Sequence, residues 1–304
     1  MPTFTAKRLR VSLLIAFALS NSVSAEQPIS ATQRTGEDVF NQLQQQLDKD
    51  TCHQDDVSKK WLKKYTKTPR EFTNHLKAIL PLLDYVSNEA KEKNLPAEFV
   101  LVPFIESWYD PAASTNTGPM GLWQMMPKTA KHFGIRFGNG YDGRYSPVDS
   151  TEAALNYLRR LQREFKHWPT TLMAYNAGDS RMRGSLKRQK LSKADAAQKL
   201  PTGLAAHTYA YIHKVEAIAC LLNHPKRFGI TLPDKTRFTP LTVVDTDVSG
   251  QNLQQLADSA QMSLGELITL NPSYRNGLKD NAPNRLLVLR TVSSENDIPL
   301  DPGN

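Results

Sequence analysis

Apolar residues recur every three or four positions along much of this 304-residue chain, which is the spacing of one buried helix face. The clearest predicted helices cover residues 72–93, 149–165 and 208–222, and shorter ones are predicted at 41–50, 120–133 and 170–177. Asp149 and Glu152 form a capping-box-like start for the second helix. Thr170 or Thr171 is the expected cap of the 170–177 helix, and Gly178 is its expected stop.

One apolar run is unbroken, from Phe99 to Ile105, and it stops at the carboxylate of Glu106. Pro96 opens it at a position favoured in a first helical turn. We therefore expect a buried helix bent near Pro103, with a buried strand as the alternative. Burial against hydrocarbon raises the pKa of Glu106, and a carboxyl that stays protonated near neutral pH can act as a general acid. A helix-end glutamate in a surface salt bridge is the alternative.

Residues 109–146 are rich in turn-forming residues, which predicts a long irregular surface on both sides of the 120–133 helix. Aromatic rings in such segments can stack on sugar rings, while amides such as Gln124, Asn116 and Asn176 bind hydroxyl groups. For each ring, burial in the core with a satisfied polar tip is the alternative. The aromatic residues concerned are Tyr109, Trp123, Tyr141, Tyr145 and Tyr175.

The pattern changes near residue 238. Residues 240–248 and 284–292 are predicted strands, and residues 252–260 and 263–271 are predicted short helices, the second capped by Ser263. This order predicts a small β-α-α-β module. The basic stretch 181–199, which has little apolar content, is expected to be a solvated loop or loose helices.

The first 25 residues have the pattern of a secretory signal. Three basic residues open the segment, and a short apolar stretch, Val11–Leu19, follows them. Small residues ending at Ala25 supply the expected cleavage site. The apolar stretch is too short to span a bilayer, and no cysteine follows that could carry a lipid anchor. We therefore expect an exported protein whose mature chain has no transmembrane helix.

Charge and cysteine content narrow the possible partners. Loss of the signal lowers Lys+Arg from 38 to 35 against 30 Asp+Glu, a mild net charge of +5 that suits a polyanionic envelope or plain solubility. Nucleic acid is not expected after export. Cys52 and Cys220 could pair in an oxidising compartment, or Cys220 could remain a buried free thiol. No Cys/His cluster has metal-ligand spacing, so we expect no metal and no other cofactor.

Three motifs follow one another in the chain, ES at 106–107, GLWQMMP at 121–127 and AYNAG at 174–178. Together they resemble the family 1 lytic transglycosylases, and among these the membrane-bound lytic transglycosylase D type, over about residues 60–290. The resemblance implies a mainly α fold, with a goose-lysozyme-like helical catalytic domain followed by a degenerate LysM-like module. The domains expected are a signal peptide (1–25), a polar segment (26–60), the catalytic domain (61–236), the module (237–292) and a flexible tail (293–304).

The resemblance also implies a substrate and a mechanism. Glu106 would be the sole acid/base, acting on peptidoglycan glycan strands in the periplasm. It would protonate the oxygen between N-acetylmuramic acid and N-acetylglucosamine. It would then accept a proton from the muramoyl 6-hydroxyl, which closes a 1,6-anhydro end without water. The residues implied to bind substrate are Ser107, Thr115, Gln124, Met126, Tyr175, Asn176 and Tyr211, the last through a hydrogen bond to Glu106.

The chain departs from the family pattern at a few positions. Thr115 replaces the usual serine, His207 and Tyr209 replace an acidic residue and an arginine, and Ser146 replaces a common aspartate. The module also lacks a clear LysM opening motif, so it could bind glycan or pack against the catalytic domain.

Two further functions stay open at this point. A hydrolytic muramidase of the goose-lysozyme kind would need a second carboxylate to activate water, and Asp110, Asp142 and Asp179 are the candidates. An inactive peptidoglycan-binding scaffold is the non-enzymatic alternative. The sequence indicates no particular protein partner.

Overall fold

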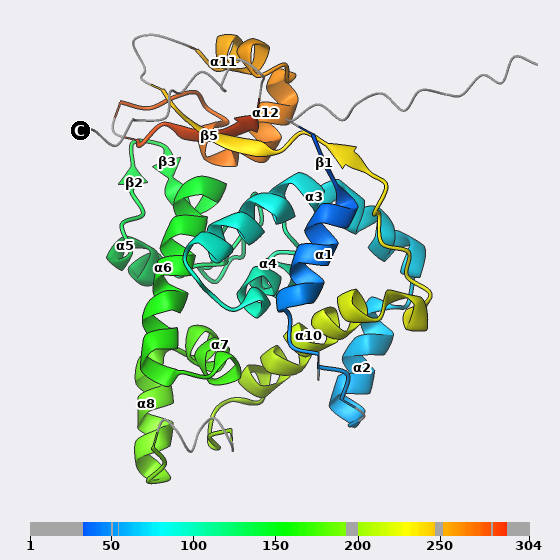
Figure 1. The fold of residues 1–304 in the computed structure, drawn as a ribbon. Coiled ribbons are helices and arrows are strands. Elements are labelled where there is room, and N and C mark those ends of the chain that lie inside the picture. The colour runs from blue at the N-terminus through cyan, green and yellow to red at the C-terminus, as the bar shows by residue number, and fades with distance from the viewer. Residues whose placement is uncertain are drawn as a thin grey trace, which may run out of the picture. The chain divides into compact units, whose positions relative to one another are not determined.

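The structure is a computed structural model that describes residues 33–49, 51–53, 55–192, 200–246, 252–280 and 282–290 (Figure 1). The predictions of a signal peptide and of a flexible tail therefore lie outside the described residues. The described chain is mainly helical, as predicted, with short antiparallel strand pairs between β1 and β4, β2 and β3, and β5 and β6. Within the described residues, no helix combines the length and the apolar character needed to cross a membrane.

The elements up to residue 145 begin with helices and end in a loop region with two short strands. Their bounds are β1 (Arg34–Thr35), α1 (Gly36–Gln46), α2 (Asp56–Tyr65), α3 (Pro69–Glu92), η1 (Ala97–Leu101), α4 (Val102–Glu106), α5 (Pro127–His132), β2 (Phe137–Gly138), β3 (Tyr141–Asp142) and η2 (Gly143–Tyr145).

The elements after residue 145 comprise longer helices and the C-terminal module. Their bounds are α6 (Pro147–Phe165), α7 (Trp168–Ala177), α8 (Asp179–Arg188), α10 (Ala206–Asn223), η3 (Pro225–Phe228), β4 (Arg237–Phe238), β5 (Leu241–Asp245), α11 (Leu253–Ser259), α12 (Leu264–Leu270), η4 (Pro272–Tyr274) and β6 (Arg285–Leu289).

The segment before α3 is more structured than its polar composition indicates. It holds two helices, α1 and α2, where the sequence predicted one at 41–50. A capping box between Thr35 and Asp38 starts α1. Val39, Phe40 and Leu43 then lie in the same core as α3, α6, α7 and α10. Burial of this apolar face stabilises α1 where helix propensity alone is insufficient.

The apolar run before Glu106 is helical, and the alternative of a strand is wrong. It begins as the 3-10 helix η1 and continues as the α-helix α4 from Val102. Pro103 lies in the first turn of α4, where its missing N–H has no intrahelical partner to lose. The chain therefore changes its helical winding next to Pro103, at the point where the sequence predicted a bend.

The predicted helix at 120–133 is wrong over its first half. The helix α5 begins at Pro127, and the preceding residues form turns in which Met120 bridges to Ser114 and Met125. Gly121 and Gln124 have φ angles of 75° and 45°, which a continuous α-helix does not allow. Leu122, Trp123 and Met125 in this stretch are buried by a folded loop.

Two helix starts also differ from the prediction. Ser146, not Asp149, is the N-cap of α6, and its Oγ accepts a hydrogen bond from the backbone N–H of Asp149. The helix α7 starts at Trp168, before Thr170 and Thr171, because Pro169 suits its first turn. The predicted stop of α7 at Gly178 is confirmed. Helix α8 occupies much of the basic stretch, and residues 193–199 of that stretch lie outside the described residues.

The C-terminal module has the predicted β-α-α-β order. β5 and β6 pair from Leu241–Leu289 to Asp245–Arg285, and Ser263 caps α12 in a capping box. The module has its own small core, which Tyr141 from the loop region enters. It also contacts α6, where an Arg285 guanidinium lies 2.7 Å from a Glu152 carboxylate oxygen. The module therefore packs against the larger helical part of the chain.

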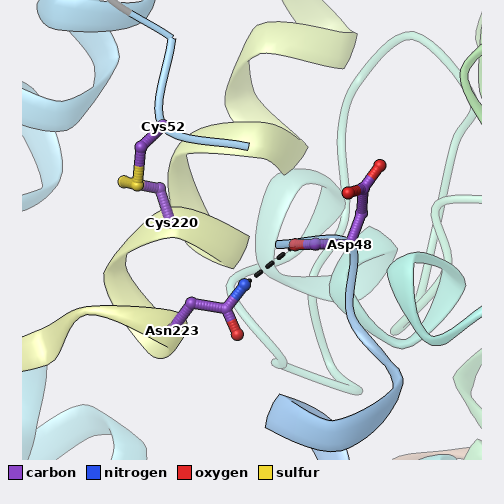
Figure 2. The surroundings of a disulfide bond; sticks show 4 residues. All are labelled: Asp48, Cys52, Cys220 and Asn223. Carbon is purple, nitrogen blue, oxygen red and sulfur yellow. Dashed lines mark hydrogen bonds between the residues drawn. A yellow bond between two sulfur atoms is a disulfide. The ribbon is translucent and has the colours of Figure 1, made fainter. Parts of the chain in front are cut away.

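Cys52 and Cys220 form a disulfide, so the alternative of a free buried thiol at Cys220 is wrong. Figure 2 shows the bond between the segment that precedes α2 and the helix α10. Beside it, the Asn223 amide donates a 2.9 Å hydrogen bond to the backbone oxygen of Asp48. The helix α2 packs against α10 (Figure 1), so the disulfide adds a covalent link beside a contact between two helices.

Candidate active site

Glu106 is the last residue of α4, and the backbone after it is fixed in an unusual conformation. Trp108 and Tyr109 have φ angles of 56° and 57°, in the left-handed region. Buried Tyr109 donates a 2.7 Å hydrogen bond to the Val100 backbone oxygen, and the Trp108 ring stacks on His75 at 4.6 Å. These contacts hold the turn that aims the Glu106 side chain.

Burial raises the pKa of Glu106 to about 7, against an ordinary value of 4.5. Two neighbours on α10 oppose this rise. Tyr211 donates a 2.7 Å hydrogen bond to Glu106 Oε1, and the positive charge of Lys214 also favours the carboxylate. A carboxyl with this pKa can both give and accept a proton near neutral pH.

Glu106 opens into a cavity of about 580 Å³. Of the residues that the sequence singled out, this cavity brings together Glu106, Thr115, Gln124, Met126, Tyr175 and Asn176. They come from α4, from the loop before α5 and from α7. Two of the expected residues, Ser107 and Tyr211, do not line it.

The loop wall of the cavity depends on a close contact at Gly121. A Cβ atom on this residue would lie 1.7 Å from the Arg144 backbone oxygen. The side chain of Arg144 is buried, and it donates hydrogen bonds to the backbone oxygen of Gly118 and to the Asp142 carboxylate. Arg144 therefore stabilises the loop by hydrogen bonds from its buried side chain, and Gly121 allows the loop backbone to lie close to the Arg144 backbone.

Three of the expected residues reach the cavity from this loop. The Gln124 amide donates a 2.8 Å hydrogen bond to the Gly121 backbone oxygen, which orients its remaining polar groups. Thr115 Oγ1 donates to the Pro119 backbone oxygen at 3.1 Å. The Met126 side chain is 50% exposed, so it offers an apolar surface at the opening.

Helix α7 forms the opposite wall. The Tyr175 hydroxyl donates a 2.9 Å hydrogen bond to the Trp123 backbone oxygen, which ties α7 to the loop. The Asn176 side-chain oxygen accepts a 2.9 Å hydrogen bond from Thr208 at the start of α10. Both side chains are thereby held in one orientation before any ligand binds.

The two expected residues outside the cavity contact residues that form its walls. Ser107 donates a 2.8 Å hydrogen bond from Oγ to the Leu122 backbone oxygen, which joins the Glu106 turn to the loop. Tyr211 is buried and contacts Glu106 directly. The Ser107 hydroxyl therefore positions the loop relative to Glu106, and the Tyr211 hydroxyl stabilises the charged form of Glu106.

Apart from Thr115, which lines the Glu106 cavity, the positions that depart from the family pattern do not line it. Ser146 is a buried helix cap. Tyr209 donates to the Pro201 backbone oxygen at 2.8 Å and so holds the chain before α10. His207 lines a separate cavity of about 280 Å³, together with Arg181 and Arg188.

The aromatic residues divide between core and cavity. Trp123, Tyr109 and Tyr141 are buried, so the sugar-stacking interpretation is wrong for these three and the core alternative holds. Tyr145 lies beneath the guanidinium of Arg275 in the module. Tyr175 alone of this group lines the cavity at Glu106.

None of the three candidate second carboxylates lines the cavity. Asp142 pairs with Arg144 at 2.7 Å, and Asp179 pairs with Arg160 at 2.7 Å. Asp110 accepts a hydrogen bond from the Ala112 backbone in an exposed turn. Of the described residues that line the cavity, Glu106 is the one that carries a carboxyl group.

Three residues near Glu106 were not predicted from the sequence. Lys214 lies one helical turn beyond Tyr211, so the two share a face of α10, and this spacing was a usable signal. Tyr157 of α6 and Arg181 of α8 also line the cavity. Their positions follow from the packing of α6, α7 and α8, which no local motif specifies. Across the described residues, no group of three His, Cys, Asp or Glu side chains could hold a metal ion.

Two stretches of the chain match known protein families. Residues 85–198 match the Transglycosylase SLT domain, and residues 243–292 match the LysM-like domain of the lytic transglycosylase MltD. The resemblance inferred from the three motifs is thereby confirmed, as is the lysozyme-like and LysM-like order of the fold.

Individual proteins show the same likeness. The membrane-bound lytic murein transglycosylase D of Escherichia coli (strain K12) is 33% identical over 197 residues, which is 64% of this chain and 43% of that protein. A protein of Alteromonas sp. (strain M-1), named for tributyltin chloride resistance, is 39% identical over 103 residues, 34% of this chain and 50% of that protein. The chain thus spans half or less of these relatives. The solved 70 kDa soluble lytic transglycosylase of Escherichia coli aligns at a TM-score of 0.37 and 20% identity, over 50% of this chain and 25% of that chain.

Proposed function

We propose that this chain, which carries an SLT domain and an MltD-type LysM-like domain, is a lytic transglycosylase of peptidoglycan. Its substrate is the β-1,4 bond between N-acetylmuramic acid and N-acetylglucosamine. The observation that supports this best is a sugar-sized cavity in which Glu106 carries the carboxyl group and has a pKa of about 7. Hydrolysis with inversion uses two separated carboxylates, and the described lining of this cavity offers one.

The reaction needs two proton transfers, and Glu106 makes both. First, protonated Glu106 gives its proton to the bridging oxygen as the bond from this oxygen to C1 of the muramoyl residue breaks. The resulting carboxylate then takes the proton of the muramoyl 6-hydroxyl, whose oxygen forms a bond to C1. The products are a free N-acetylglucosamine hydroxyl and a 1,6-anhydro end, so no water is consumed and Glu106 returns to its protonated state.

The neighbours of Glu106 have separate roles in this proposal. Tyr211 holds Oε1 and leaves Oε2 for the substrate, and it stabilises the carboxylate between the two steps. Thr115, Gln124 and Asn176 bind hydroxyl and acetamido groups of the glycan, and Met126 and Tyr175 supply apolar contact. Ser107 positions the turn after Glu106.

The chain acts in an oxidising compartment outside the cytoplasm. Its disulfide supports this placement, because such bonds persist mainly in exported proteins. Together with the predicted signal and the peptidoglycan substrate, it favours the periplasm.

Digestion of purified sacculi followed by mass spectrometry tests the proposal. The wild-type chain is expected to release muropeptides with 1,6-anhydro ends, and Glu106→Gln is expected to release none. Glu98→Gln is the matched control, because Glu98 is another buried glutamate that contacts the Asp48 backbone outside the cavity. Release of reducing ends alone would mean a hydrolytic muramidase, and lysis by Glu106→Gln at the wild-type rate would rule out the catalytic role.

A further inference from the structure

A second cavity, of about 390 Å³, adjoins the segment that carries Glu106. Ile105 and Trp108, which flank Glu106 and Ser107, both line it. Its other walls come from α2, from the start of α3 and from α10, at Trp61, Lys64 and Lys214 among others.

Aromatic rings form one surface of this second cavity. Tyr65 stacks on Trp108 with ring centroids 5.8 Å apart, and Trp61 lies 6.2 Å from Tyr65. Trp108 is 36% exposed although its ring contacts His75, Phe72 and Phe104 on other sides. A row of aromatic rings that stays partly exposed is suited to contact an apolar or planar group of a ligand.

Two lysine side chains face the same space. The Nζ atoms of Lys64 and Lys214 lie 5.0 Å and 4.8 Å from the centre of the Trp61 ring. In the described part of the chain, neither forms an ion pair with a carboxylate within 4.0 Å. Burial and the charge of Lys64 both lower the pKa of Lys214, whereas Glu106 raises it. The two ammonium groups therefore repel each other, and an anion between them would relieve that repulsion.

The remaining charge at this cavity does not cancel theirs. Glu71 lines it too, and its carboxylate accepts a hydrogen bond from Thr68 within the same turn of chain. Lys60 adds a further positive charge, 6.0 Å from the Trp61 ring. The rim is thus positive overall. A positive rim favours a ligand that carries a negative charge, which an uncharged sugar ring does not.

We propose that this second cavity binds the peptide that peptidoglycan carries on its muramoyl residues. A peptide carboxylate lies between Lys64 and Lys214, and the adjoining backbone and side chains cover Trp61 and Trp108. The inference rests on the proposed function for the identity of the polymer. It adds that the enzyme recognises the peptide as well as the sugar chain.

The wall that carries these groups is held firmly in place. The disulfide fixes the segment before α2 to α10. Ser58 near the start of α2 lies 3.1 Å from the His213 ring nitrogen, and Asp55 caps the helix. The helices that carry Lys64 and Lys214 are therefore held together without a ligand, which lowers the entropy cost of binding.

Calorimetric titration of the full chain carrying Glu106→Gln tests the proposal, with glycan strands that retain their peptides and with strands stripped of them. Strands with peptides are expected to bind more tightly. Adding Lys64→Gln should weaken binding of these strands about two- to fivefold, the size of one exposed charge pair, and leave binding of stripped strands unchanged. Lys63→Gln, on the exposed side of the same helix, is the control.

Equal affinity for the two kinds of strand would overturn the proposal. An equal loss with both in Lys64→Gln would also overturn it, because the cavity would then hold the sugar chain itself. Binding is measured in a variant that is not expected to cleave, so this result does not depend on the chemistry at Glu106. Failure of the wild-type chain to form anhydro ends would contradict the proposed function and leave the binding result standing.

Discussion

The hydroxyl of Tyr211 donates a 2.7 Å hydrogen bond to Oε1 of Glu106, across 105 positions of sequence. Burial raises the pKa of Glu106, and this bond together with Lys214 lowers it again, which leaves a value of about 7. The proton affinity of the carboxyl is therefore set mainly by burial and is adjusted by two side chains on α10. Changes on α10 should appear in the pH dependence of the reaction.

Tyr211→Phe should move the alkaline limb of the pH profile of kcat/KM to higher pH. Loss of the donor leaves burial less opposed, so the pKa of Glu106 rises, by less than about one unit for a hydrogen bond worth about 1 kcal/mol. The rate at the optimum should fall about fivefold, because the carboxylate formed in the first step loses its donor. Tyr209→Phe, which removes a hydroxyl from the same helix without touching Glu106, should leave the limb in place. An unmoved limb in Tyr211→Phe would contradict this account.

Glu106→Gln should make the folded state more stable than wild type at neutral and alkaline pH. The folded-state pKa is about 7 and the ordinary value is 4.5, so between these values the folded chain binds more protons than the unfolded one. Wild-type stability therefore falls as pH rises from 4.5 to about 7 and then levels off.

The amide does not titrate, so the stability difference between variant and wild type should grow across that interval. Because Glu106 also borders the open cavity, we expect a gain on the order of 2 kcal/mol. Thermal or urea unfolding of both proteins at several pH values measures it. A stability difference that does not change with pH would show that ionisation of Glu106 does not destabilise the folded chain.

Gly121→Ala should disrupt the loop wall of the Glu106 cavity, whereas Gly134→Ala should not. Both glycines have positive φ angles, 75° and 89°, so each substitution carries a backbone strain of about 1–2 kcal/mol. At Gly121 the new methyl group would also meet the Arg144 backbone oxygen, while nothing lies within 4 Å of it at Gly134. We expect Gly121→Ala to cost about 2 kcal/mol more than Gly134→Ala in urea unfolding and to lose activity. Equal costs would mean that the loop adapts to the methyl group.

Much of the cavity at Glu106 could be predicted because three short motifs carry it. Glu106, Gln124 and Asn176 each belong to one motif, and the structure brings all three to one cavity. Ser107 belongs to the same motif as Glu106, yet its hydroxyl contacts the Leu122 backbone. A motif thus identifies which residues come together. It does not distinguish side chains that line the cavity from side chains that support its walls.

Local patterns were weakest where another constraint competed with helical spacing. Leu122, Trp123 and Met125 are buried as in a helix, yet the positive φ of Gly121 makes their segment a turn. The start of α6 was misplaced because Pro147, the first helical residue, outweighs the capping pattern at Asp149. The lysine pair at Trp61 was missed because it arises from packing of α2 on α10, which periodicity does not encode.

The bond between Cys52 and Cys220 also affects where the proposed enzyme completes its folding. A ribosome releases this chain with two thiols, and in the reducing cytoplasm they stay apart. Without the disulfide, the helix α2, which carries Trp61 and Lys64, is held to α10 by packing and hydrogen bonds alone. In the proposed periplasmic location the disulfide can form, so the disulfide-linked arrangement would be reached there. A chain with the proposed activity on peptidoglycan would thus reach its disulfide-linked form in the compartment that holds its substrate.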